Sequence, residues 1–180
     1  MSELSIRDAG LNDIPALHAL IEGAYRGEGS RRGWTTEADL LGGQRTDPEA
    51  LAAILVDPKQ AILMAERDGA LVGCVLIADR GGDTGYLGML SVDPELQSGG
   101  IGRALVRAAE REVQARWGAR RLEMQVFWQR DSLIAWYARQ GYEPTGETCP
   151  FPMHDPRLGV PLRNDLWFVV LARELASSPA

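Results

Sequence analysis

The sequence contains few cysteines and no long apolar run. Cys74 and Cys149 are the only cysteines among 180 residues, and they are too far apart for a metal-ligand spacing. Neither a disulfide framework nor a metal centre is therefore expected. No apolar segment approaches the roughly 20 residues that a membrane-spanning helix needs, and the charged N-terminus lacks an apolar signal core. We expect a cytoplasmic protein without membrane attachment.

An excess of positive charge is also missing. The formal net charge is −6 and the sequence pI is about 5.0, so the surface as a whole is unsuited to nucleic acid. A content of 45% hydrophobic and 24% charged residues is typical of a soluble globular protein. The length fits one domain with a substantial core. We predict a single domain over residues 1–175, followed by a disordered tail at 176–180.

Hydrophobic periodicity and turn residues predict a mixed α/β fold. Strands are expected at 4–7, 60–66, 71–78, 86–92, 121–127, from Tyr142, and at 166–171. Helices are expected from Asn12 to about Glu22, from Thr35 or Thr36 to about Leu41, after Thr46, and at 100–117 and 132–139. Asp68-Gly69 is a hairpin signal, and only the strands flanking the 100–117 helix should run parallel. The prediction is a mostly antiparallel sheet of six to seven strands with helices on its faces.

The most informative segment runs from an apolar strand through a glycine-rich loop into a helix. In this segment, Gln97-x-x-Gly100-x-Gly102 places two glycines where backbone N–H groups can meet a ligand. The N-terminus of a helix presents unpaired N–H groups and a positive dipole end, which favour phosphate. The segment therefore predicts that the main chain holds a phosphorylated cofactor.

Two other phosphate-binding motifs fit this loop poorly. A P-loop requires Lys followed by Ser or Thr, and Arg103-Ala104 stands there instead. A dinucleotide-binding fingerprint requires a small residue where Leu105 stands, and its distal acid would be Glu123, inside a strand that follows three antiparallel strands. The alternative that these glycines only form a tight strand-to-helix turn, without binding a ligand, stays open.

Two motifs together resemble a known family. Val92-x-Pro94-x-x-Gln97-x-x-Gly100-Ile101-Gly102, followed by a helix, looks like motif A of the GCN5-related N-acetyltransferases (GNAT). The segment 131–144 resembles the second signature of that family, a helix with an aromatic pair followed by Gly141 and Tyr142. The resemblance covers roughly residues 60–171 and implies a GNAT-like fold with a central, splayed pair of parallel strands.

The resemblance also implies a site for acetyl-coenzyme A (acetyl-CoA). The cofactor would lie between strands 86–92 and 121–127, where a bulge in one strand makes the pair separate. The positions that match the family's cofactor contacts are Leu90 and Val92, for the pantetheine through main chain, and Gln97, Ser98, Gly99, Gly100, Ile101 and Gly102, for the pyrophosphate, with Arg103 close behind. Arg130 stands where the family commonly has asparagine, and it is a candidate for a phosphate contact.

The same resemblance assigns catalytic roles. Tyr137 matches a tyrosine near the acetyl sulfur, where a phenol can protonate the departing thiolate; the alternative is an aromatic core residue. A carboxylate would take the proton of the substrate amine. Glu123 is the candidate carried forward, although Glu28 and Glu37 are alternatives and the sequence does not choose among them.

The acceptor pocket is expected between the segments 23–43 and 150–161. Trp34 and Thr35 are its candidate substrate contacts. These assignments predict an N-acetyltransferase that moves the acetyl group to a primary amine of a small molecule by direct attack in a ternary complex. The alternatives are a protein or peptide N-acetyltransferase and a non-catalytic acyl-CoA-binding regulatory module. A homodimer is possible.

Overall fold

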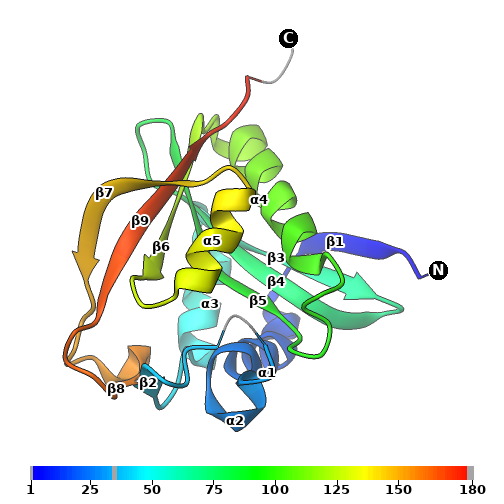
Figure 1. The fold of residues 1–180 in the computed structure, drawn as a ribbon. Helices are drawn as coiled ribbons and strands as arrows, with labels where there is room; N and C mark the ends of the chain where they lie inside the picture. Colours follow the sequence, from blue (N-terminus) through cyan, green and yellow to red (C-terminus); the bar gives the residue numbers. More distant parts are fainter. Residues whose placement is uncertain (1, 34–35, 178–180) are drawn as a thin grey trace.

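The computed structural model describes residues 2–33 and 36–177. Seven strands form one sheet in the order β1-β3-β4-β5-β6-β9-β7, and two short strands, β2 and β8, pair separately (Figure 1). The seven strands are β1 Leu4–Asp8, β3 Gln60–Arg67, β4 Ala70–Asp79, β5 Thr84–Val92, β6 Arg121–Phe127, β7 Glu143–Pro150 and β9 Trp167–Glu174. The short pair is β2 Leu41–Gly42 and β8 Val160–Pro161.

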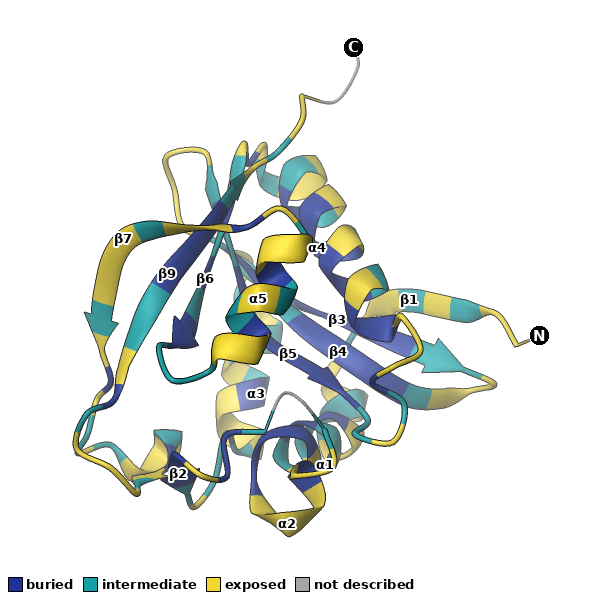
Figure 2. Ribbon diagram, viewed as in Figure 1, coloured by how far each residue is buried: buried dark blue, intermediate teal, exposed yellow. Residues whose placement is uncertain are grey.

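Helices cover both faces of the sheet. The helical segments are α1 Ile14–Tyr25, α2 Gly27–Ser30, α3 Pro48–Val56, α4 Ile101–Trp117, α5 Asp131–Arg139 and the 3₁₀ turns η1 Leu11–Asp13 and η2 Pro156–Leu158. Apolar residues of α4 and α5 share a core cluster on one face, whereas α1 and α3 pack on the other face against β3 and β4. The central strands are accordingly the most deeply buried part of the chain (Figure 2).

The strand pairing confirms the predicted fold class. Within the described residues, β5 and β6 are the only parallel neighbours, and the other pairs of the large sheet are antiparallel. The expected hairpin between β3 and β4 is present, with Asp68 at φ 53° and Gly69 at φ 78°. Positive φ at both turn positions suits the twist of the flanking strands.

The expected helix from Thr35 or Thr36 to about Leu41 is wrong. Thr35 lies outside the described residues, and the chain from Thr36 onward makes a single turn, in which the N–H groups of Leu40 and Leu41 bond to the carbonyl of Glu37. Leu41 then pairs with Pro161 in β8. This pairing with a distant segment overrides the local helical signal, and the short helix α2 lies earlier in the chain.

A glycine on β4 lets helix α4 lie close against the sheet. A Cβ atom at Gly73 would stand 2.8 Å from Leu105 Cδ1 and 3.0 Å from Ile101 Cγ2. Ile101 and Leu105 are fully buried on the inner side of the helix. This contact fixes the N-terminus of α4, and with it the glycine-rich loop, at the end of β5.

Candidate active site

The parallel strands β5 and β6 separate partway along their length. They pair only from Thr84 to Tyr86, opposite Arg121 to Glu123. A bulge in β5 follows, because Leu76 pairs with Gly88 and Cys74 pairs with Ser91, which leaves two residues of β5 opposite one of β4. One of these two, Met89, has a φ of 47°. An extra residue of this kind bends a strand and ends its pairing, and here it opens the sheet beside β6.

Side chains satisfy the carbonyl groups along this opening. The Tyr25 hydroxyl donates to the Leu90 carbonyl at 2.5 Å, and Gln97 Nε2 donates to the Val92 carbonyl at 3.1 Å. Buried carbonyl groups need partners, and these two side chains supply them where β5 no longer pairs with β6. Burial raises the pKa of Tyr25 to about 12, so this phenol keeps its proton and stays a donor.

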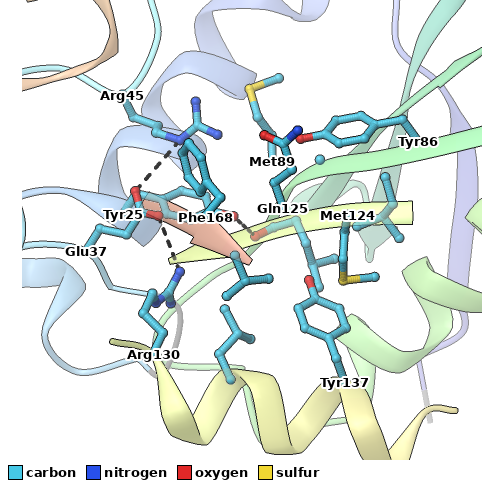
Figure 3. A pocket seen from close by; sticks show the side chains of 15 residues that line it. Tyr25, Glu37, Arg45, Tyr86, Met89, Met124, Gln125, Arg130, Tyr137 and Phe168 are labelled. Carbon is cyan, nitrogen blue, oxygen red and sulfur yellow. Dashed lines mark hydrogen bonds and ion pairs between the residues drawn. The ribbon is translucent and has the colours of Figure 1, made fainter. Parts of the chain in front are cut away.

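The opening forms a cavity of about 90 Å³ (Figure 3). Residues of β5, β6, α5 and the N-terminal segments line it, and they include Tyr25, Glu37, Arg45, Tyr86, Gly88, Met89, Leu90, Met124, Gln125, Val126, Arg130, Leu133, Tyr137 and Phe168. Segments far apart in the sequence, from α1 at the N-terminal end to β9 at the C-terminal end, therefore meet where the strands separate.

Tyr137 approaches this cavity from α5. Its side chain is 4% exposed, its ring meets Trp136 and Tyr142 edge-on, and its hydroxyl points toward the cavity (Figure 3). Burial raises the pKa of Tyr137 well above the ordinary value for tyrosine. The phenol is thus neutral at physiological pH and has a proton to donate.

The glycine-rich loop lies between the end of β5 and helix α4. Gly100 adopts φ 77°, and the first helical hydrogen bond joins the Ala104 N–H to the Gly100 carbonyl. The N–H groups of residues 101–103 precede that bond and so have no partner within the helix. Ser98, Gly99 and Gly100 are exposed, as is Arg103. Exposed amides beside an open strand edge fit a cofactor that has a diphosphate and an amide-containing arm.

Two other loop residues have their side chains turned inward. The Gln97 side chain is buried by its contact with the Val92 carbonyl, and Ile101 is fully buried in the core. Gly102 lies on the buried side of α4. Contacts of Gln97, Ile101 and Gly102 with a ligand would therefore come from their main chain.

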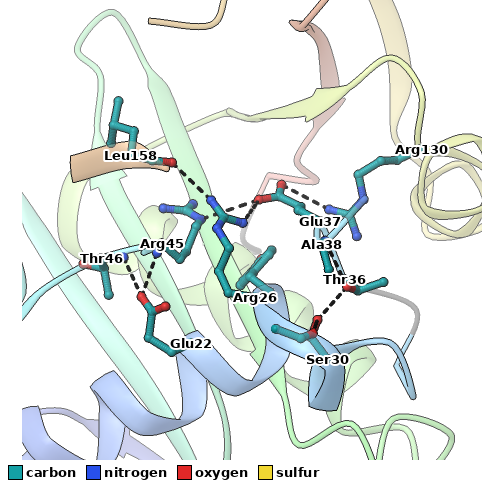
Figure 4. Close-up of polar contacts among 12 residues, drawn as sticks. Glu22, Arg26, Ser30, Thr36, Glu37, Ala38, Arg45, Thr46, Arg130 and Leu158 are labelled. Atoms are coloured by element: carbon teal, nitrogen blue, oxygen red, sulfur yellow. Dashed lines mark hydrogen bonds and ion pairs between the residues drawn. The ribbon is translucent and has the colours of Figure 1, made fainter. Parts of the chain in front are cut away.

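Glu37 lies among three arginines at the other end of the cavity (Figure 4). Arg26 Nη1 lies 2.7 Å from Glu37 Oε1, Arg130 Nη1 lies 3.4 Å from Oε2, and Arg45 Nε lies 4.0 Å from Oε1. Arg26 also donates to the Leu158 carbonyl at 3.1 Å. This Arg26–Arg45–Arg130–Glu37 cluster joins the 26–45 segment to α5 and to the loop before β9.

A second cavity, of about 260 Å³, lies on the far side of Glu37 and Arg45. Both cavities are lined by Glu37, Arg45, Gln125 and Phe168, so they adjoin. The rings of Phe127, Phe151 and Phe168 pack against one another here, with the Phe127 and Phe168 centroids 4.4 Å apart. The structure thus brings together the segments 23–43 and 150–161, where the sequence places the acceptor pocket.

Ion pairs hold the side chains of two residues predicted from the sequence. Glu123 lines neither cavity and pairs with Arg121 at 2.9 Å. Arg130 lines the smaller cavity and pairs with Glu37 at 3.4 Å. Trp34 and Thr35 are outside the described residues. Sequence reasoning missed Tyr25, Arg26 and Arg45, because no local motif marks residues that meet the site only through the fold.

Two kinds of feature are absent from the described ranges 2–33 and 36–177: a membrane-spanning helix and a metal-binding group. No helix there is both long and apolar enough to cross a bilayer. In the same ranges no three His, Cys, Asp or Glu side chains are grouped so that they could hold a metal ion.

Comparison with known proteins agrees with this geometry. The Acetyltransferase (GNAT) family model matches residues 20–142, whereas no curated protein matches the chain. The ribosomal-protein-S18-alanine N-acetyltransferase of Escherichia coli is a similar solved structure, with a TM-score of 0.70 and 17% identity over 98% of this chain and 97% of that one. The putative acetyltransferase yncA of Salmonella typhimurium, solved with acetyl-CoA, has a TM-score of 0.70 and 19% identity over 99% and 98%. The ribosomal-protein-alanine N-acetyltransferase of Brucella melitensis has a TM-score of 0.69 and 23% identity over 95% of this chain and 99% of that one.

Because the family model matches more than half of the sequence, and the sheet opens beside a glycine-rich loop, the chain belongs to the GNAT acetyltransferase family.

Proposed function

We propose that this protein transfers an acetyl group from acetyl-CoA to the primary amine of a small molecule. The observation that carries the proposal is the separation of β5 and β6, with Tyr137 lining the cavity between them and the 97–102 loop following the end of β5. Acetyl-CoA, when bound, supplies a thioester carbonyl that an amine can attack. The cofactor would lie along Leu90 and Val92, with its diphosphate at the unpaired amides of residues 101–103 at the start of α4.

Tyr137 would act as the general acid. Its buried phenol lies at the cavity and stays protonated, so it can give its proton to the departing thiolate. The amine would attack directly while both substrates are bound. A covalent acetyl-enzyme would need an activated nucleophile, and Cys74 is unsuited to that role because it is buried and burial raises the pKa of its thiol to about 12.

Two carboxylates are candidates for the base that takes the amine proton. Glu37 lines both cavities, so an amine entering from either one would meet its oxygens, directly or through water. Glu123 is on the same strand face as Gln125, which lines the cavities, but Glu123 itself lines neither of them. We place Glu37 ahead of Glu123 on this geometry.

The test combines binding with turnover. Titration calorimetry with acetyl-CoA should show binding, and free-thiol release should follow with some members of a panel of amino acids, polyamines, aminoglycosides and N-terminal peptides. Binding without turnover of any amine would favour the regulatory module, and turnover of peptides alone would favour a protein N-acetyltransferase. Absence of binding at millimolar acetyl-CoA would overturn the proposal.

A further inference from the structure

The charges around the two cavities do not balance. Among the described residues that line them, three guanidinium groups, those of Arg26, Arg45 and Arg130, face one carboxylate, that of Glu37. With Glu37 ionised, the cluster carries two positive charges in excess, although the protein as a whole is acidic. This sign of charge is unexpected at a site that is to receive an amine.

The excess charge is well shielded from solvent. The side chains of Arg26 and Arg130 are 5% and 9% exposed, and that of Arg45 is 26% exposed. Arg26 Nε is buried and has no hydrogen-bond partner. Buried charge without a counter-ion is costly, so an anionic group entering the cluster would be strongly favoured.

The nearby carboxylates outside the cavities are already engaged. Glu22 accepts the backbone N–H groups of Arg45 and Thr46, and Asp155 pairs with Arg157. These groups hold the loops that carry the cluster and do not face Glu37. Arg45 lies with its guanidinium carbon 5.2 Å from the centre of the Tyr25 ring, which orients it at the junction of the two cavities.

We propose, resting on the acetyltransferase function above, that the acceptor is a free α-amino acid with an apolar side chain. Its carboxylate would bind Arg45 and Arg130, since a guanidinium matches a carboxylate in geometry and charge. Its side chain would enter the 260 Å³ cavity against Phe127, Phe151 and Phe168. The amine would then lie beside Glu37, at the end of the smaller cavity that Tyr137 also lines.

This assignment separates acceptors by charge. A polyamine or an aminoglycoside would bring further positive charge to the cluster and be rejected. A peptide N-terminus has an amide carbonyl in place of the carboxylate and would leave the excess positive charge of the cluster uncompensated. An amino acid amide has the same shape as the acid and lacks only the charge, which makes it the decisive comparison.

The experiment measures thiol release with L-phenylalanine, L-leucine and L-methionine, each beside its carboxamide, and with spermidine. We expect kcat/KM to be at least about tenfold higher for the acids than for the amides. Arg45→Gln should raise KM for the acids by about tenfold or more and lower the ratio of kcat/KM between acids and amides, and Arg45→Lys should recover part of the loss. Arg111→Gln, on the exposed side of α4, is the matched control.

A binding measurement separates failure of this assignment from failure of the proposed function. Titration with N-acetyl-L-phenylalanine in the presence of CoA should release heat, and N-acetyl-L-phenylalaninamide should not. If the amides or spermidine are acetylated as well as the acids, the anion site is wrong while the acetyltransferase function stands. If no amine is acetylated, the proposed function fails, and equal heats from the two titrants would then overturn the anion site as well.

Discussion

The hydroxyl of Tyr25 donates a 2.5 Å hydrogen bond to the backbone carbonyl of Leu90, which joins the last turn of α1 to the bulged strand beside the cavity. Tyr25 is 7% exposed and Leu90 is 2% exposed. The bond therefore gives a buried carbonyl a donor. It ties α1, whose Tyr25 lines the smaller cavity, to the strand that would meet the cofactor.

Tyr25→Phe should destabilise the protein by about 1–3 kcal/mol, because it leaves the buried Leu90 carbonyl without a donor. Urea unfolding would measure the loss as a lower midpoint with an unchanged slope. Leu11→Ala is the control, since Leu11 is 55% exposed and its truncation should change stability little. An unchanged midpoint for Tyr25→Phe would mean that this bond contributes nothing.

Two glycine substitutions should have opposite effects. Gly73→Ala would press a methyl group against Leu105, Ile101 and the Ser91 carbonyl, at 2.8–3.1 Å, and should cost about 1–3 kcal/mol. Gly23→Ala, within α1, meets nothing within 4 Å and should stabilise the helix by about 0.5–1 kcal/mol. Thermal and urea unfolding of the pair would check both signs, and a stable Gly73→Ala variant would contradict the close packing of α4.

Tyr137→Phe should lower kcat by roughly ten- to a thousandfold while the affinity for acetyl-CoA stays close to that of the parent protein. In the parent protein, the rate should rise as the acceptor amine loses its proton and should not fall again as the pH approaches about 10. The reason is that burial raises the pKa of Tyr137 above the ordinary value of about 10, so the phenol keeps its proton at higher pH. A full rate in Tyr137→Phe at saturating acceptor would exclude this role.

Glu37→Gln should lower kcat/KM by about a hundredfold if Glu37 is the base, and Glu123→Gln should change it by less than about threefold. The defect of Glu37→Gln should shrink at alkaline pH, where the amine is already deprotonated, whereas a purely structural defect would persist. Calorimetry with acetyl-CoA would show that each variant is folded. A larger loss in Glu123→Gln would place the base on β6 instead.

Local sequence signals predicted the elements that hold the cofactor site. The hairpin at Asp68-Gly69, the glycine-rich loop before α4 and the helix that carries Tyr137 each follow from residues close together in the chain. Turn geometry, capping and apolar spacing act over only a few residues, so a sequence can encode them directly. The central, splayed pair of parallel strands was expected from the family that these motifs resemble.

Local signals failed where distant segments decide the conformation. The helix expected at 36–41 did not form, because Leu41 pairs with Pro161 and Glu37 is bound by arginines from two other segments. The position of Arg130 in the motif made it a candidate for a phosphate contact. Its ion pair with Glu37, which lies 93 residues earlier in the chain, follows from no local signal.

The sequence by itself determined the class of fold and the main-chain loop suited to a diphosphate, because glycine positions and apolar periodicity are local properties of the chain. Only the tertiary structure decided which charged side chains line the two cavities. Arg26, Arg45, Arg130 and Glu37 come from separate segments, and folding alone brings them to the same buried point, where their charges interact strongly.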